Sequence, residues 1–187
     1  MKIVVIDNYD SFVYNLIRYV KEITNDEVFV MRNDQINYSV LDSCDALLLS
    51  PGPGIPSEAG ELMNVISKYF KTKKILGVCL GHQALGQFFG IELIQCKEPV
   101  HGKSSVIKHC LNDSLFQQLP PEIEVGRYHS WVLSNVFPEE INISAETLEG
   151  EVMAFSHRKY PIVGVQFHPE SILTPFGRKI IENWIKS

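Results

Sequence analysis

KILGVCLGHQALGQFFG, residues 74–90, is the stretch from which the fold of this chain can be deduced. Its first part is an apolar run typical of a buried strand, and its second part has the composition of a helix. Cys79 stands between the two, with Gly77 and Gly81 two residues away on either side. A G-x-C-x-G turn between a strand and a helix is the cysteine counterpart of the G-x-S-x-G nucleophile elbow. The pattern therefore predicts a tight corner that exposes one thiol at the carboxyl end of a sheet.

Strand-like and helix-like segments alternate over residues 1–90. The runs that predict strands are KIVVI (2–6), EVFVM (27–31), DALLLS (45–50) and KILGV (74–78). The segments that predict helices are DSFVYNLIRYVKEI (10–23), SEAGELMNVISKYF (57–70) and GHQALGQFF (81–89). We expect Asp10 or Ser11 to cap the first helix, and the second to begin near Ser57 with Glu58 and Glu61 in its first turn. The alternation predicts an α/β fold with an open, mostly parallel sheet flanked by helices.

The pattern changes after Gly90. Short β-like runs follow: SSVIKHC (104–110), IEVGRYHSWVL (123–133), INISAET (141–147), EVMAFSH (151–157) and PIVGVQF (161–167). These could extend the sheet or form a small extra β layer in the second half. TPFGRKIIENWIKS (174–187) predicts a closing helix with Pro175 in its first turn. Because no repeat, linker or low-complexity segment interrupts the pattern, we expect one domain over residues 1–187.

The composition excludes several classes of function. Hydrophobic residues make up 45% of the chain and charged residues 21%, with a formal net charge of -5. This balance is that of a globular protein, and it does not favour a surface for nucleic acid or anionic membranes. The start of the chain has too short an apolar run for a signal peptide. The four cysteines have no paired spacing, so we expect a reduced, cytoplasmic protein.

The predicted elbow would activate the Cys79 thiol. The sulfur would lie over a helix N-terminus, where the dipole favours the thiolate form. The Leu80 N–H would point to the place where an oxyanion forms. The alternative is a buried core cysteine in a tight turn, and this is the interpretation we give to Cys44, Cys96 and Cys110. Cys79 differs from these only if the chain supplies a base.

VQFHPES (165–171) supplies that base. His168 is expected at the end of a strand, beside a proline where the chain leaves the sheet. Glu170 follows two residues later and could orient the imidazole. A carboxylate-held base offered to a thiolate is the logic of a catalytic triad. The alternative is a surface His-Pro turn with a solvated glutamate.

LLLSPGPGIP (47–56) predicts a stiff loop after a strand. Gly52, Pro53 and Gly54 would fix the direction of the backbone amides, which could then bind an anionic or carbonyl oxygen. The next glycine is Gly60, so the segment does not fit the G-x-G-x-x-G dinucleotide fingerprint. Its alternative is an ordinary rigid turn.

Taken together, SPGPG (50–54), GVCLGHQA (77–84), YHS (128–130) and HPES (168–171) resemble the class I (Cys-His-Glu) glutamine amidotransferases. IDNYDSF (6–12), RND (32–34) and HGK (101–103) narrow the resemblance to the glutaminase subunits (component II) of anthranilate synthase and aminodeoxychorismate synthase. The resemblance covers the whole chain and implies a flavodoxin-like fold. EVGRYHSW (124–131) and ENWIKS (182–187) favour the anthranilate synthase type, and a subunit shared by both synthases stays open.

The resemblance implies that Cys79 is the nucleophile, His168 the base and Glu170 its orienting group. The residues implied to bind glutamine are Gly52, Pro53, Gly54, Leu80, Gln83, Ser130 and Trp131. Gln83 lies one helical turn beyond Cys79, so its side chain can border the same pocket. Relatives often carry leucine at the position of Trp131, which a residue contributing only backbone groups would tolerate. His82 and His129 are expected to be structural, because the six histidines show no metal-ligand spacing.

The implied partner is a chorismate-binding synthase large subunit (component I), which receives ammonia released from L-glutamine. No cofactor is expected in this chain, whereas the partner synthase is implied to depend on Mg²⁺. PVHGKSS (99–105) is expected to be a basic, glycine-containing loop; the resemblance implies that it contacts this partner, and the alternative is a plain solvated connection. Two other classes stay open: a different cysteine hydrolase of the same fold, and a non-enzymatic binding module with a relic site.

Overall fold

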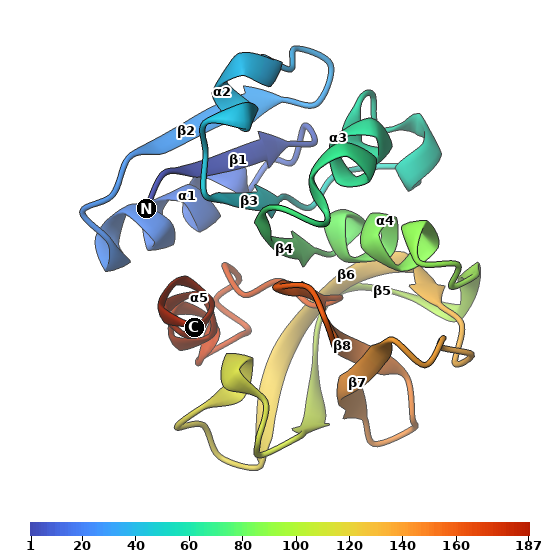
Figure 1. The fold of residues 1–187 in the computed structure, drawn as a ribbon. Helices are drawn as coiled ribbons and strands as arrows, with labels where there is room; N and C mark the ends of the chain where they lie inside the picture. Colours follow the sequence, from blue (N-terminus) through green and yellow to red (C-terminus); the bar gives the residue numbers. More distant parts are fainter.

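A nine-stranded sheet organises the chain in the computed structural model, which describes residues 1–187 apart from the side chain of Lys97 (Figure 1). Its strand order is β2-β1-β3-β4-β9-β8-β7-β5-β6. The strands are β1 (Ile3–Asp7), β2 (Val28–Arg32), β3 (Ala46–Leu49), β4 (Lys74–Val78), β5 (Leu93–His109), β6 (Glu122–Leu133), β7 (Ile141–Thr147), β8 (Val152–His157) and β9 (Ile162–Val165). The first five strands in this order, β2, β1, β3, β4 and β9, pair parallel to one another. From β9 onward, each strand pairs antiparallel with the next: β9 with β8, β8 with β7, β7 with β5, and β5 with β6.

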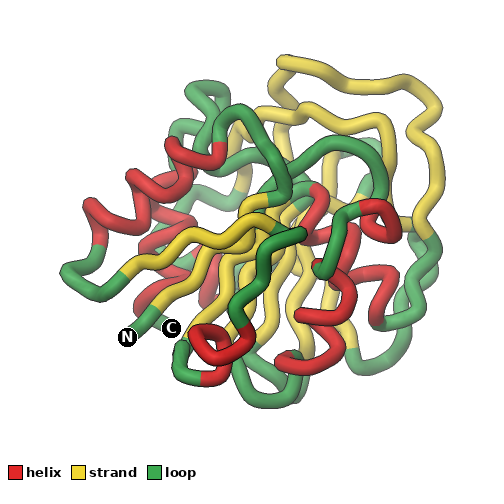
Figure 2. Tube along the Cα trace, turned by 90° about the horizontal axis from the view of Figure 1, so that it is seen from above, coloured by secondary structure: helices red, strands yellow, loops and turns green.

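The helices lie on both faces of the parallel strands, as Figure 2 shows from above. They are α1 (Val13–Ile23), α2 (Tyr38–Asp42), α3 (Leu62–Tyr69), α4 (Leu80–Phe88) and α5 (Gly177–Lys186), with short 3₁₀ turns η1 (Pro56–Glu58) and η2 (Ser114–Phe116). The predicted α/β fold is therefore confirmed. The second-half strands continue the same sheet, which is the first of the two arrangements that the sequence left open.

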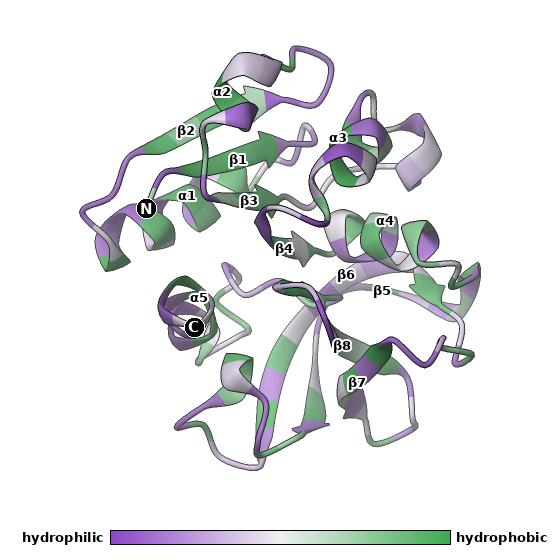
Figure 3. Cartoon of the chain, viewed as in Figure 1, coloured by the Kyte–Doolittle hydropathy of each residue, from purple (hydrophilic) through white to green (hydrophobic). Residues whose placement is uncertain are grey.

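Alternating side chains of the parallel strands build two hydrophobic cores. On β1, Ile3 and Val5 pack on the face covered by α1 and α5, while Val4 and Ile6 pack on the face covered by α2, α3 and α4. Such strands are apolar along their whole length because both of their faces are buried. Figure 3 shows this hydrophobic colouring on β1 and β3. The carboxyl ends of these strands are consequently held at one edge, where the loops that bear polar residues emerge.

Three predicted helix starts are wrong. The helix α1 begins at Val13, because the Asp10 carboxylate accepts a hydrogen bond from the Phe12 N–H at 2.8 Å and forms a turn before the helix. The segment from Ser57 is a 3₁₀ turn, and α3 begins only at Leu62, after Gly60 has adopted a positive φ of 54°. The closing helix α5 begins after Pro175.

The start of α5 is set by packing. A Cβ added to its first residue, Gly177, would lie 1.7 Å from the Pro169 carbonyl oxygen. Only a glycine therefore lets the helix approach the HPES turn this closely.

Two further expectations are corrected. PVHGKSS is part of the long strand β5, which pairs with β6 and is irregular between Gln95 and Val100 and between His101 and Lys103, so it is a bulged strand and not a loop. Cys110 is exposed and Cys96 is half-buried, so only Cys44 fits the buried core position that we predicted for all three. None of the helices that the structure describes is long and apolar enough to cross a membrane.

Candidate active site

Cys79 occupies the predicted elbow between β4 and α4. Its φ of 51° and ψ of −100° are strained for a residue with a side chain, and it is the N-cap of α4. A Cβ on Gly77 would lie 2.5 Å from the Gly81 carbonyl carbon and oxygen, and one on Gly81 would lie 2.4 Å from the Leu49 oxygen. A side chain at either position would collide with backbone, which explains why both residues are glycines. The Cys79 N–H donates to the Val165 oxygen at 2.8 Å, which ties the elbow to β9.

His168 and Glu170 lie on the turn that follows β9. The His168 Nδ1 atom is 2.6 Å from the Oε1 atom of Glu170, and both residues are buried at 6% exposure. The His168 N–H donates to the Gly126 oxygen, and the Thr174 hydroxyl donates to the His168 oxygen. The imidazole is also packed edge-on against Tyr128, with ring centroids 5.0 Å apart. The backbone of His168 is thus held by Gly126 and Thr174, and its ring by Glu170 and Tyr128.

The second ring nitrogen of His168, Nε2, is buried and has no hydrogen-bond partner among the described residues. Burial lowers the pKa of His168, but the opposing effects of Cys79 and Glu170 hold this pKa well above its usual value. A histidine beside a thiolate and a carboxylate is favoured as imidazolium. The arrangement can therefore hold a proton next to Cys79 near neutral pH and release it to a leaving group.

The SPGPG loop reaches the elbow through Asn8, which follows β1. Asn8 Nδ2 donates to the Ser50 oxygen at 2.8 Å, and the Asn8 N–H donates to Ser50 Oγ at 2.9 Å. A Cβ on Gly52 would lie 2.5 Å from the Asn8 oxygen and 2.9 Å from the Leu80 side chain. Gly52 therefore permits a close approach between this loop and the residue that follows Cys79.

A pocket of about 620 Å³ contains the thiol and the imidazole. Its lining comes from the loop after β1, from α1, from the SPGPG loop and from the HPES turn. The lining residues are Tyr9, Asp10, Ser11, Phe12, Asn15, Arg18, Tyr19, Pro51, Gly52, Pro53, Cys79, Tyr128, His168, Glu170, Ser171 and Ile172. Of the predicted site residues, the structure thus brings Cys79, His168, Glu170, Gly52 and Pro53 to one cavity.

The other predicted binding residues lie beside or behind this cavity. Gly54 ends the SPGPG loop with a positive φ of 75°, and Leu80 is the first residue of α4. Gln83 is buried in α4, and its Nε2 atom donates to the Trp131 oxygen at 2.8 Å. Ser130 Oγ is 3.2 Å from His101 Nε2. The roles of these residues in glutamine binding stay predictions.

Sequence reasoning missed three residues of the site. Asn8 positions the SPGPG loop, Tyr128 packs on His168, and Gln166 places its Nε2 atom 3.6 Å from Cys79 Sγ. A signal existed for Gln166, because an amide inside the apolar run PIVGVQF must find buried hydrogen-bond partners. A signal for Asn8 is its position at the carboxyl end of a parallel strand, where functional loops meet.

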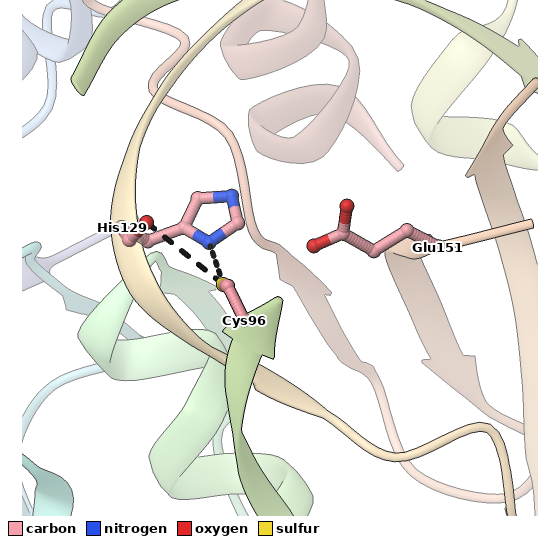
Figure 4. A group of neighbouring side chains, drawn as sticks. All are labelled: Cys96, His129 and Glu151. Atoms are coloured by element: carbon pink, nitrogen blue, oxygen red, sulfur yellow. Dashed lines mark hydrogen bonds between the residues drawn. The ribbon is translucent and has the colours of Figure 1, made fainter. Parts of the chain in front are cut away.

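His82 and His129 are buried, as their predicted structural role requires. Burial lowers the pKa of each to about 3, so both rings are neutral near neutral pH. His129 joins Cys96 and Glu151 in a group whose ligand-type atoms lie within 4.8 Å of one another (Figure 4). The spacing along the sequence could not reveal this group, because its residues come from three separate segments.

Arg127 makes this group a poor metal site. Its guanidinium is ion-paired with Glu151, and its Nε atom donates to His129 Nε2 at 3.1 Å. His129 Nε2 must then carry a lone pair, which leaves the proton on Nδ1, 3.5 Å from Cys96 Sγ. Burial also raises the pKa of Cys96 to about 11, which keeps its thiol protonated. A buried hydrogen-bonded cluster explains these contacts without a cation.

Known proteins match the chain over nearly its whole length. The family model for glutamine amidotransferase class-I matches residues 4–187. The aminodeoxychorismate/anthranilate synthase component 2 of Bacillus subtilis is 42% identical, over 99% of this chain and 96% of that protein. The bifunctional protein TrpGD of Thermotoga maritima is also 42% identical, but the chain spans only 32% of its length. Further relatives, 41% to 43% identical, are named anthranilate synthase component 2.

The fold agrees with these relationships. The crystal structure of a provisionally named GMP synthase subunit from Thermoplasma acidophilum has a TM-score of 0.89 and 31% identity, over 100% of this chain and 92% of that chain. Matches of this extent show the family. The chain therefore belongs to the class-I glutamine amidotransferases and is an enzyme of that type.

Proposed function

We propose that this chain is the glutaminase subunit of a chorismate-aminating synthase, with anthranilate synthase as the first candidate. The observation that carries the proposal is the buried His168–Glu170 pair beside Cys79, in a chain that covers almost the whole length of a component 2 relative. The function predicted from the sequence agrees with the names of these relatives.

The first half-reaction releases ammonia. The Cys79 thiolate attacks the side-chain carbonyl carbon of L-glutamine, and the negative charge that forms on oxygen is stabilised by backbone N–H groups. Leu80 is our main candidate for this donor, because its N–H begins α4, and Gly52 is the second. Protonated His168 then gives its proton from Nε2 to the departing nitrogen. The products are ammonia and a thioester between Cys79 and the glutamyl group.

The second half-reaction restores the enzyme. Neutral His168 takes a proton from a water molecule, whose oxygen attacks the thioester carbonyl carbon. The carbon–sulfur bond breaks, glutamate leaves, and the Cys79 thiolate again faces an imidazolium. Glu170 holds the ring in one orientation through Nδ1 during both steps. These steps need no cofactor in this chain.

Glutamine is bound, in this proposal, by the SPGPG loop and by the region of Gln83, Ser130 and Trp131. Gly52 and Pro53 line the cavity beside Cys79. The Trp131 carbonyl already accepts a hydrogen bond from Gln83, so this residue acts through its backbone. That use explains why a large tryptophan ring is tolerated at this position.

The partner is proposed to cover the mouth of the pocket. Three exposed apolar side chains, Tyr9, Phe12 and Ile172, line this pocket, and Ile172 is 94% exposed. Exposed apolar residues gathered at one site are typical of a protein interface. A synthase subunit seated there would receive ammonia before it is lost to water.

Unpaired thiols such as Cys110 suit a reducing compartment, so we place the complex in the cytoplasm.

Aminodeoxychorismate synthase is the second candidate, because the Bacillus subtilis relative carries both names. The acceptor binds the partner subunit, so this chain's own residues do not select between the two. The test is to mix the chain separately with component I of each synthase and to supply chorismate, Mg²⁺ and glutamine. We expect glutamine-dependent anthranilate with the first partner. Formation of aminodeoxychorismate alone would favour the second candidate, and no amination with either partner would reject the proposal, provided that added ammonium supports both.

A further inference from the structure

Gln166 is a buried amide that the mechanism above does not use. It follows β9 directly and is two residues before His168, and its exposed fraction is 0%. Its backbone N–H donates to the Met153 oxygen at 2.8 Å, so the main chain continues the line of the sheet at this point. A side-chain amide buried this deeply costs free energy unless its polar atoms are hydrogen-bonded. Its partners therefore define its role.

Those partners form a series of hydrogen bonds that ends on the sulfur of Cys79. The Trp131 oxygen accepts from Gln83 Nε2 at 2.8 Å, and Gln166 Oε1 accepts from the same Gln83 Nε2 at 3.1 Å. Gln166 Nε2 in turn lies 3.6 Å from Cys79 Sγ, within the range of a hydrogen bond to sulfur. This hydrogen-bond series joins β6, α4, the end of β9 and the elbow.

The Trp131 carbonyl determines which group donates in each hydrogen bond of this series. A backbone carbonyl oxygen can only accept hydrogen bonds, so Gln83 must present its NH₂ group to Trp131. The same NH₂ group faces Gln166, which must therefore present its oxygen to Gln83. The NH₂ group of Gln166 is then left to face the sulfur. Reversing either amide would place two acceptors or two donors against each other.

We propose that Gln166 is a further catalytic residue, whose side-chain N–H stabilises negative charge on Cys79 Sγ, and that Gln83 is the positioning residue that orients it. This proposal deepens the proposed glutaminase mechanism and rests on it. A hydrogen bond from N–H favours a thiolate over a thiol, because a donor interacts more strongly with the charged acceptor. When the thioester forms, the sulfur loses its charge and the contact weakens, so Gln166 also assists the return of the sulfur as a leaving group.

Alkylation by iodoacetamide tests this proposal without glutamine. The thiolate displaces iodide from carbon, so the rate at Cys79 follows the thiolate fraction and can be measured at each pH by peptide mass. In Gln166→Met, the side chain keeps its length and loses its donor. We expect a rate about tenfold lower near pH 7. A hydrogen bond to a charged group shifts an equilibrium, here that between thiol and thiolate, by about this factor. The rate at high pH, where the thiol is ionised in both proteins, should not fall, because a thiolate without this donor is at least as nucleophilic.

Two more variants separate this effect from damage to the fold. Gln166→Glu keeps the acceptor for Gln83 and removes the donor. The pH at which its alkylation rate is half-maximal should therefore rise at least as far as in Gln166→Met. Gln87→Met, on the exposed side of α4, is the matched control and should follow the wild-type profile. Thermal unfolding of each variant shows whether the protein is folded at the assay temperature.

The outcomes are distinguishable. A Gln166→Met or Gln166→Glu profile that coincides with wild type would overturn the proposal, as would an equal loss of rate at every pH in a folded protein. A shifted profile in a chain that does not hydrolyse glutamine would support the role of Gln166 and contradict the proposed function. Unshifted profiles in an active glutaminase would contradict the role of Gln166 and support the proposed function.

Discussion

His168 Nδ1 lies 2.6 Å from Glu170 Oε1, and the opposite nitrogen of the same ring is buried without a hydrogen-bond partner among the described residues. One edge of the imidazole is thus held by a carboxylate, while the other is available to the reaction. Because neither side chain is appreciably solvated, the charge of Glu170 acts on the ring with little screening. This asymmetry is the physical basis of the first two predictions.

Replacement of Glu170 by glutamine should lower the pKa of His168 towards its ordinary value, since one of the groups that raises it is lost. The folded-state pKa of wild-type His168 lies above the unfolded value of about 6.5. Protonation of His168 therefore stabilises the fold fully below pH about 6.5, and this stabilisation is lost as pH rises through the folded-state pKa. The stability difference between wild type and Glu170→Gln should shrink over that window, as measured by urea unfolding. A difference that grows with pH would contradict it.

His168→Asn should reduce glutamine hydrolysis by roughly 10³-fold or more, because removal of one member of a catalytic unit disables the rest. Glu170→Gln should lose less, since a neutral amide can still hold the ring. Ammonia release from glutamine measures both, with the partner subunit present. Near-wild-type turnover in folded His168→Asn would mean that another base operates.

Gly81→Ala should destabilise the protein by about 3 kcal/mol or more, because its Cβ would overlap backbone that cannot move. The added atom would lie 2.4 Å from the Leu49 oxygen. Gly150→Ala is the control: its φ is 82° but nothing lies within 4 Å of the added Cβ, so only about 1–2 kcal/mol is expected. Denaturant unfolding gives both free energies. Equal costs would show that steric overlap does not set the elbow.

The elbow was predictable from sequence because its pattern is local. Gly77, Cys79, Gly81 and the apolar run before them stand in one short segment, although the backbone that excludes a Cβ at Gly81 belongs to Leu49 of β3. The HPES turn was predictable for a similar reason, since His168 and Glu170 are two residues apart. Asn8 and Gln166 were missed because their partners are far along the chain: Asn8 bonds Ser50, and Gln166 bonds Gln83 and Cys79. The helix starts at Val13 and Leu62 were missed because local turns competed with helical caps.

Ile172→Asp should weaken binding of the synthase partner by about tenfold or more, because a charge would replace an apolar side chain at the proposed interface. Val136→Asp is the matched control, as Val136 is 80% exposed and does not line the pocket. Titration of labelled partner with each variant gives the dissociation constants. Equal weakening by both substitutions, or by neither, would place the interface elsewhere.

The measurement that tests the central claim most directly is covalent labelling with a glutamine analogue whose side-chain amide is replaced by a diazoketone. Once the diazo carbon has taken a proton from His168, the Cys79 thiolate should displace N₂ and form one carbon–sulfur bond per chain. Intact mass and peptide mapping should find a single adduct on Cys79, and glutamine should slow its formation. An adduct on Cys44, Cys96 or Cys110 in place of Cys79, or labelling that glutamine does not slow, would contradict the assignment of Cys79 as the glutamine nucleophile.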